Sequence, residues 1–91
     1  MPEQYSILIC DDHAILLEGL KLCLQCTPGV GNVHVCTAIH DAVQLLDSGC
    51  HVDLCIVDLD LSDGSGIALI EHIKRVLPKV RTMVYTSHEE I

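Results

Sequence analysis

The stretch that determines the fold runs from Val52 to Gly66 and reads VDLCIVDLDLSDGSG. Its first part, Val52 to Val57, is a short, mainly apolar run that ends directly at Asp58. Such a run is typical of a strand buried on both faces of a parallel sheet. The second part is rich in Asp, Ser and Gly, which favour a loop. The stretch therefore predicts a strand that carries an aspartate at its carboxyl end.

Three further apolar runs predict three more strands: Ser6 to Cys10, Val33 to Cys36 and Val80 to Tyr85. Polar residues follow the first and the last of these runs. Asp11 and Asp12 come directly after the first, and Thr86 and Ser87 come directly after the last. Side chains with oxygen atoms therefore recur where predicted strands end.

Helical patterns separate the predicted strands. From His13 to Cys26, apolar residues form a stripe with helical spacing: Leu16, Leu20, Cys23 and Leu24. The segment from Pro28 to Gly31 ends this helix. Asp41 can cap a second helix, which ends at Gly49. The inner face of this second helix is formed by Ala42, Leu45 and Leu46.

A third predicted helix follows the Asp58 loop, and its inner face is formed by Ile70, Ile73 and Leu77. Lys74 and Arg75 provide the positive charge that suits a helix carboxyl end, and Pro78 closes the helix. Ser87 to Glu90 has the form of a capping box, so a further helix should begin there. Strands that alternate with helices at this spacing predict an α/β fold with a parallel sheet and helices on both faces.

The 91 residues are enough for one small domain, and 49% of them are hydrophobic, so the chain can build a core. Its 13 acidic and 5 basic residues give a net charge of -8, which repels nucleic-acid phosphates and anionic membrane surfaces. We therefore expect no direct binding of nucleic acid or membrane by this segment. The start of the chain lacks the pattern of a signal peptide, and no apolar stretch approaches membrane-spanning length. These features predict a cytoplasmic protein.

Six cysteines are many for a chain of this length, and Cys23 and Cys26 have the C-x-x-C spacing of zinc and redox sites. Their leucine-rich neighbours look like an amphipathic helix, and no second C-x-x-C follows. Buried free cysteine is the commoner state in a protein without an export signal. We therefore expect free thiols without metal.

Parallel sheets of this kind bind ligands outside the carboxyl ends of their strands. The predicted strand ends carry Asp11 and Asp12, Asp58 and Asp60, and Thr86. Carboxylates at one edge repel one another unless a cation lies between them, and oxygen ligands favour Mg²⁺. A carboxylate placed there can also attack a phosphoryl group and form an acyl phosphate. Each aspartate alone also fits a turn, so the convergence of three strand ends is what indicates a site.

Three motifs along the chain match a known family. They are Ile7 to His13, which contains Asp-Asp-His; Asp53 to Leu59, with Gly66 eight positions after Asp58; and Val84 to Ser87. Together they resemble the receiver domain of two-component response regulators. The Asp58 to Gly66 segment, with Asp-Asp-His and the Glu18-Gly19-Leu20 helix, looks like the LuxR-like (NarL/FixJ-type) subclass. That subclass usually joins a receiver to a DNA-binding domain for transcription regulation.

The resemblance implies a flavodoxin-like (CheY-like) doubly wound sheet and a role for each matching residue. Asp58 would accept the phosphoryl group from a sensor histidine kinase. Asp11 and Asp12 would bind Mg²⁺ together with Asp58, and the backbone carbonyl of Asp60 would complete the protein ligands. Thr86 would be the switch hydroxyl that hydrogen-bonds the phosphoryl group.

Two further positions would tune hydrolysis of the acyl phosphate. They are Asp60 and His88, which lie two residues after Asp58 and Thr86. Of the six histidines, His13 and His88 are the ones expected near this edge.

The resemblance also implies a fifth strand and helix, with a lysine that contacts the phosphoryl group. The sequence stops at Ile91, before these would follow. We therefore expect residues 1–91 to form a receiver domain truncated after the fourth of the usual five strands, without an output domain in this chain. The sequence is then either a fragment of a longer regulator or a naturally shortened receiver. Val80 to Tyr85 would then be an edge strand, which favours either a homodimer or strand-mediated self-association, or a poorly folded chain.

Two other functions remain open at this point. The chain could be an interaction module that keeps the receiver fold without phosphorylation, because the lysine is absent. It could instead be a Mg²⁺-dependent phosphohydrolase with an aspartyl intermediate, although the sequence indicates no separate substrate cap. The favoured interpretation is a phosphoacceptor signalling domain rather than an enzyme.

Overall fold

The structure is a computed structural model that describes residues 4–86. Along these residues the elements are β1 (Tyr5–Cys10), α1 (Ala14–Gln25), β2 (Val30–Cys36), α2 (Ile39–Asp47), β3 (Leu54–Asp58), β4 (Asp60–Leu61), β5 (Gly64–Ser65), α3 (Gly66–Val76) and β6 (Arg81–Tyr85). The predicted alternation of strands and helices is confirmed. The helix expected from Ser87 and the position of His88 lie outside the described residues.

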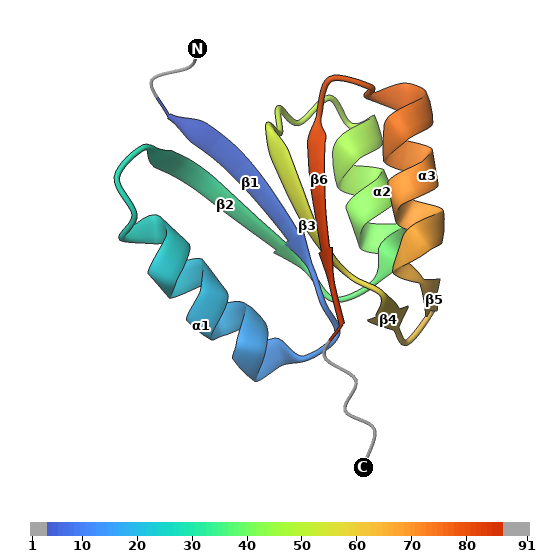
Figure 1. Ribbon diagram of the computed structural model, residues 1–91, viewed down its shortest axis with the longest axis horizontal. Coiled ribbons are helices and arrows are strands. Elements are labelled where there is room, and N and C mark those ends of the chain that lie inside the picture. The colour runs from blue at the N-terminus through green and yellow to red at the C-terminus, as the bar shows by residue number, and fades with distance from the viewer. Residues whose placement is uncertain (1–3, 87–91) are drawn as a thin grey trace.

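β1, β2, β3 and β6 form one parallel sheet in the order β2-β1-β3-β6. Figure 1 shows α1 on one side of this sheet and α2 and α3 together on the other. The predicted doubly wound parallel sheet is therefore confirmed. Because the four strands run in the same direction, their carboxyl ends meet at one edge, where Asp58 of β3 lies in register with Tyr85 of β6.

Alternate residues of β1 contribute to two separate apolar layers. Ile7 and Ile9 face α1 and pack with Leu17 and Val33. Leu8 and Cys10 face the opposite layer, which contains Cys36, Ala42, Leu46, Val52, Cys55, Val57, Leu61, Leu69 and Ile73. Full burial of one aliphatic side chain stabilises a fold by about 1.5–3 kcal/mol. Packing on both faces holds β1 and β3 firmly and fixes the positions of the aspartates that follow them.

The buried side of α1 differs from the predicted stripe. Leu17 is buried, and Leu20 and Leu24 are partly buried against β1 and β2. Leu16 and Cys23, which were expected to face inward, are exposed. A helix with this many leucines offers several helical stripes, and the one that contacts Ile7 and Ile9 becomes the inner face.

α2 is capped differently from the prediction. Its N-cap residue is Ala38, whose side chain makes no capping bond, and Asp41 lies within the first turn. The capping acceptor is Asp63, from the loop after β3. Its carboxylate accepts hydrogen bonds from the backbone N–H groups of Ile39, at 3.0 Å, and His40, at 3.2 Å. The predicted Asp41 cap is wrong because the chain brings a distant aspartate to the helix start.

In α3, Leu69 and Ile73 are fully buried, whereas Ile70 and the residue after the helix, Leu77, are only partly buried against the same cluster. The inner face therefore includes Leu69, which the predicted set of Ile70, Ile73 and Leu77 omitted. Leu69 lies four residues before Ile73, so the two share one face of the helix.

The start of β2 also differs from the prediction. Val30 pairs with Tyr5 of β1, and a register irregularity follows before Ile7 pairs with Val33. The turn lies just before this strand, at Gly29, whose φ of +91° is in the left-handed region that favours glycine. The other strand starts differ by one or two residues: Leu54 instead of Val52, and Arg81 instead of Val80.

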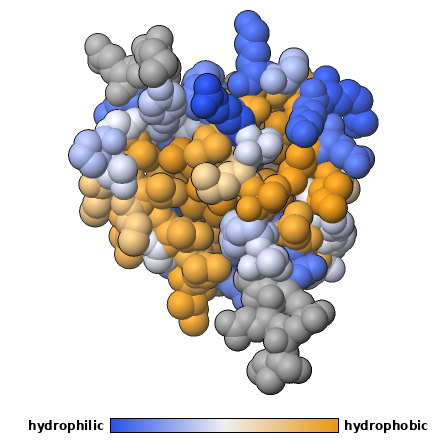
Figure 2. Space-filling view, in the orientation of Figure 1, coloured by the Kyte–Doolittle hydropathy of each residue, from blue (hydrophilic) through white to orange (hydrophobic). Residues whose placement is uncertain are grey.

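β6 exposes apolar side chains on both faces of the sheet. Met83, in register with Ile56 on the α1 face, is 55% exposed, and Val84, on the α2 and α3 face, is 47% exposed. Figure 2 shows an apolar surface gathered over the middle of the face in view. No helix within residues 4–86 has both the length and the apolar character needed to cross a bilayer.

Candidate functional site

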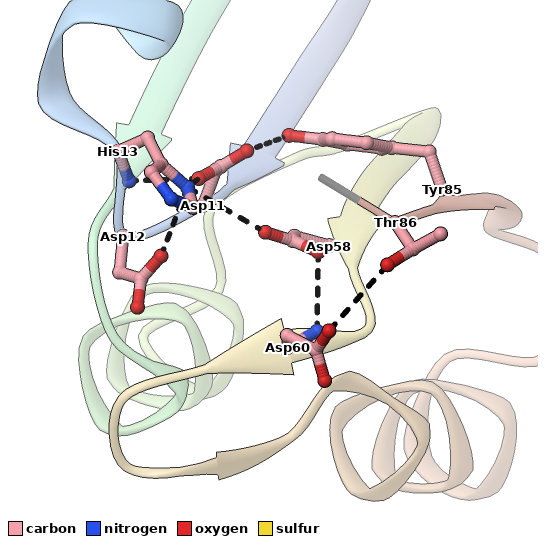
Figure 3. Close-up of polar contacts among 7 residues, drawn as sticks. All are labelled: Asp11, Asp12, His13, Asp58, Asp60, Tyr85 and Thr86. Atoms are coloured by element: carbon pink, nitrogen blue, oxygen red, sulfur yellow. Dashed lines mark hydrogen bonds and ion pairs between the residues drawn. The ribbon is translucent and has the colours of Figure 1, made fainter. Parts of the chain in front are cut away.

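The strand ends bring together the residues that the sequence singled out. Asp11 and Asp12 follow β1, Asp58 ends β3, and Tyr85 and Thr86 come at and directly after the end of β6. Figure 3 shows the side chains of these residues gathered around one acidic edge. The convergence expected from the parallel sheet is therefore found.

Asp11 is completely buried and has three close donors. Its Oδ1 accepts hydrogen bonds from the backbone N–H of His13 at 2.7 Å, and contacts the Nδ1 of the same residue at 2.8 Å. The hydroxyl of Tyr85 donates to its Oδ2. A buried carboxylate needs such donors because it has lost its hydration.

Asp58 is also completely buried. Its Oδ1 accepts a hydrogen bond from the backbone N–H of Asp60 at 3.1 Å, and its Oδ2 lies 3.8 Å from Nδ1 of His13. Figure 3 shows its carboxylate between the Asp11 side and the Asp60 side of the edge. The backbone of the following loop therefore helps to orient the carboxylate.

Gly66 allows the chain after Asp58 to fold back closely. A Cβ atom at this position would lie 2.2 Å from the carbonyl oxygen of Asp58 and 2.9 Å from Cγ1 of Val57. The glycine N–H donates to the carbonyl oxygen of Leu59 at 2.9 Å, and α3 begins at once. The loop between Leu59 and Gly66 forms the short antiparallel hairpin of β4 and β5, which the sequence did not predict. Only a residue without a side chain fits where α3 starts.

Asp12 contributes the least satisfied oxygen of the edge. Its Oδ1 is buried and has no hydrogen bond within the described part of the chain, although Nδ1 of His13 lies 3.1 Å away. Ligand atoms of Asp11, Asp12, His13 and Asp58 all lie within 4.8 Å of one another. Three carboxylates with an unsatisfied oxygen among them fit a divalent cation such as Mg²⁺, which prefers oxygen ligands.

Thr86 and Asp60 lie on the outer side of the edge. The Thr86 hydroxyl donates to Oδ2 of Asp60 at 3.4 Å. Asp60 thus contacts Asp58 through its backbone and Thr86 through its side chain. The roles expected for the Asp60 carbonyl and for the Thr86 hydroxyl stay predictions.

Two side chains at the edge have pKa values shifted by their surroundings. The pKa of His13 is raised mainly by its hydrogen bond to Asp11, against a smaller opposing effect of desolvation. The pKa of Tyr85 is raised by burial and by its hydrogen bond to Asp11. Both shifts have the direction expected of groups that lie against the Asp11 carboxylate.

Sequence reasoning gave no role to Tyr85 and did not foresee how His13 contacts the carboxylates. A signal was present for each. His13 directly follows the aspartate pair in the sequence. Tyr85 is the last residue of an apolar run that forms β6, the strand next to β3. What the sequence could not indicate is that the Tyr85 hydroxyl reaches across β3 to Asp11, directly after β1.

Comparison with known proteins agrees with this geometry. Residues 7–91 match the family model of the response regulator receiver domain. The chain is 33% identical over 88 residues to the transcriptional regulatory protein RcsB of Salmonella typhi, covering 91% of this chain and 39% of that protein. It is 25% identical over 83 residues to the DNA-binding transcriptional activator DevR/DosR of Mycobacterium tuberculosis, covering 91% and 38%. The chain thus spans about two fifths of the length of these relatives.

Solved structures of receivers have the same fold. The non-phosphorylated receiver domain of RcsB from Escherichia coli superimposes with a TM-score of 0.82 at 28% identity, covering 96% of this chain and 68% of that one. The MaeR response regulator bound to beryllium trifluoride gives a TM-score of 0.84 at 25% identity, covering 96% and 70%. Because the family model matches residues 7–91, nearly the whole chain, this chain belongs to the receiver domain family of two-component response regulators.

Proposed function

We propose that Asp58 is the phosphoryl acceptor of this receiver domain, with a sensor histidine kinase as the donor. The observation that carries the proposal is the complete burial of Asp58 at the end of β3, beside a second buried carboxylate, Asp11. Isolated buried carboxylates are costly, so a pair of them at a ligand-binding edge of a sheet favours a functional role.

The chemistry follows from the position of Asp58. A carboxylate oxygen attacks the phosphorus of the donor's phosphohistidine, the P–N bond breaks, and an acyl phosphate forms on Asp58. The backbone N–H of Asp60 orients the carboxylate by holding its Oδ1. Reactions of this kind depend mainly on positioning and charge neutralisation.

We propose Mg²⁺ as the cofactor, held by Asp11, Asp12 and Asp58 with the backbone carbonyl of Asp60. The bound ion would neutralise charge that develops on the phosphoryl oxygens. The buried, unsatisfied Oδ1 of Asp12 supports this assignment. Thr86, whose hydroxyl contacts Asp60, is proposed to turn toward the phosphoryl group once it is attached.

We further propose that the phosphorylated receiver passes its signal to a DNA-binding output domain, because its relative RcsB is a transcriptional regulatory protein and its relative DevR/DosR is a DNA-binding transcriptional activator. Residues 1–91 are proposed to be the receiver portion alone. The buried thiols of Cys10, Cys36 and Cys55 support a reducing, cytoplasmic setting.

Acetyl phosphate labelling tests the acceptor. The 91-residue chain is incubated with acetyl phosphate and Mg²⁺, and the modified residue is mapped by mass spectrometry. We expect one acyl phosphate in the wild type and none in Asp58→Asn. Asp53→Asn is the matched control, because Asp53 lies just before the opposite end of β3. Labelling at equal yield after Asp58→Asn would contradict the proposal. Failure to label the wild type would instead favour an interaction module.

A further inference from the structure

We infer that His13 supplies an imidazole nitrogen to the divalent-ion site, so that this receiver binds Co²⁺, Ni²⁺ and Zn²⁺ more tightly than a site made of oxygen ligands alone. The inference rests on the metal site of the proposed function and extends it to one residue and to a class of ion. It concerns which cations the site prefers.

The first observation is the position of the imidazole nitrogen relative to the carboxylates. Nδ1 of His13 lies 2.8 Å from Oδ1 of Asp11, 3.1 Å from Oδ1 of Asp12 and 3.8 Å from Oδ2 of Asp58. In an octahedral site with bonds of about 2.1 Å, neighbouring ligand atoms are separated by about 3.0 Å. The two shorter distances therefore match adjacent ligands of one ion, and the third is somewhat longer.

The second observation is that the imidazole is held in this position by the chain itself. The backbone N–H of His13 donates to Oδ1 of Asp11, so the residue is fixed next to the carboxylate that its side chain contacts. Figure 3 shows the ring lying between Asp11 and Asp12. A ligand already in place loses little conformational freedom when an ion binds.

The chemical argument concerns ligand type. Carboxylates and water suit Mg²⁺, whereas imidazole suits later divalent metals, and affinities for nitrogen-containing sites rise from Mn²⁺ toward Ni²⁺ and Cu²⁺. An imidazole beside three carboxylates therefore adds little for Mg²⁺ and much for Co²⁺, Ni²⁺ or Zn²⁺. Such ions would compete with Mg²⁺ at the same edge.

The same distances also describe a different arrangement, in which a protonated His13 occupies the place of the cation and only pairs with the carboxylates. The two arrangements predict opposite effects of removing the ring. If His13 is a ligand, His13→Ala weakens the binding of later divalent ions. If it only takes the place of the cation, its removal strengthens the binding of every divalent ion.

The test is titration calorimetry of the full 91-residue chain with Co²⁺ and with Mg²⁺, each compared between the wild type and His13→Ala. Even residues that only support a metal ligand change affinity by about 10–100-fold, so loss of a direct ligand should weaken Co²⁺ binding at least about tenfold. Mg²⁺ affinity should fall less than Co²⁺ affinity, because Mg²⁺ binds chiefly oxygen. His51→Ala is the matched control, since His51 also contacts an aspartate, Asp53, at 3.0 Å.

A spectroscopic readout identifies the ligand directly. With bound Co²⁺, imidazole proton signals shifted by the paramagnetic ion should be present in the wild type and in His51→Ala, and absent in His13→Ala. Unchanged or stronger Co²⁺ binding in His13→Ala would overturn the inference, as would a wild type that binds no Co²⁺. Acetyl phosphate labelling of the wild type and of Asp58→Asn with Mg²⁺ tests the acceptor role separately, because it does not depend on how His13 affects Co²⁺ binding.

Discussion

The carboxylates of Asp11 and Asp58 are fully buried where the strands of an otherwise apolar sheet end. Taking an ion out of water costs several kcal/mol in a protein unless other groups offset it. Here His13 and Tyr85 contact Asp11, and the backbone of Asp60 contacts Asp58. Each donor offsets part of the cost, so the site is sensitive to single substitutions and to the arrival of any cation.

Gly66 provides a test of how closely the chain folds back on Asp58. Gly66→Ala places a Cβ atom 2.2 Å from the carbonyl oxygen of Asp58, so the start of α3 must shift. We expect the free energy of unfolding, measured by urea titration, to fall by at least about 1–3 kcal/mol.

Gly19→Ala is the control for Gly66→Ala. No atom lies within 4 Å of a Cβ placed at Gly19, which is inside α1. Alanine there should raise stability by about 0.5–1 kcal/mol, because glycine weakens a helix interior. Equal effects of the two substitutions would show that the close approach at Gly66 is not tight.

The thiols differ strongly in their surroundings. Burial raises the pKa of Cys55 from its ordinary 9.0 to about 12 and that of Cys36 to about 11. Cys23 and Cys26 are exposed. We expect iodoacetamide to modify Cys23 and Cys26 first and to reach Cys55 only on unfolding, as followed by mass spectrometry.

The same shifts predict how stability depends on pH. The thiols of Cys36 and Cys55 hold their protons more tightly in the folded protein than in the unfolded chain. Their contribution to the free energy of unfolding is therefore complete below pH 9. It is lost as the pH rises from about 9 toward 12. Urea titrations across this range should show falling stability, with a smaller slope in Cys55→Ala. An identical slope in that variant would contradict the assignment.

At the scale of elements, the sequence predicted the type and order of the helices and strands better than it predicted where they end and which face is buried. Apolar runs and helical spacing depend on local chemistry, so β1, α1 and α3 were found near their predicted positions. The inner face of α1 was wrong at Leu16 and Cys23, because its leucines satisfy more than one stripe and the sheet decides between them.

The start of α2 is the element-scale feature with the clearest test. Asp63 accepts two backbone hydrogen bonds there, and the bond from Ile39 is the main cause that lowers its pKa. Since the folded pKa is below the unfolded one, this contribution is present above the unfolded pKa of about 3.8 and is lost as the pH falls through the folded value.

Asp63→Ala should therefore have a lower melting temperature than the wild type at neutral pH. In strong acid the melting temperatures of the two proteins should lie much closer together. Asp63→Asn, which keeps one acceptor oxygen, should lie between the wild type and Asp63→Ala. The helical signal at α2 can be followed by hydrogen exchange of the Ile39 and His40 amides. Unchanged exchange in Asp63→Ala would show that the cap does not hold the helix start.

At the scale of the whole molecule, the doubly wound parallel sheet followed from the alternation of strands and helices, since crossover rules leave few alternatives. The acidic edge followed as well, because parallel strands end together. The contacts that cross the edge, such as Tyr85 to Asp11, join residues far apart in the chain. Those depend on how side chains pack in three dimensions, which no local pattern indicates.

The exposed strand β6 leads to an expectation about assembly. Within residues 4–86, β6 pairs with β3 alone, and it exposes Met83 and Val84 on opposite faces. Unpaired edges with apolar side chains favour pairing with another chain. We therefore expect the 91-residue chain to self-associate with rising concentration in sedimentation velocity experiments.

Met83→Lys should weaken this association, because a charged side chain blunts an edge strand. Ile15→Lys is the control, since Ile15 is 91% exposed and lies on a helix, α1, rather than on the edge strand. Equal association of the two variants, or a wild type that stays monomeric and melts cooperatively, would contradict a role for this edge.

The cap on α2 also has a consequence for the order in which the protein forms during synthesis. The backbone N–H groups of Ile39 and His40 donate to Asp63, which lies 24 and 23 positions later in the chain. A ribosome releases α2 before Asp63 exists outside the exit tunnel, so the first turn of this helix stays frayed while β3 is being made. The nascent chain therefore gains this cap on α2 only when the loop beyond Asp58 has emerged.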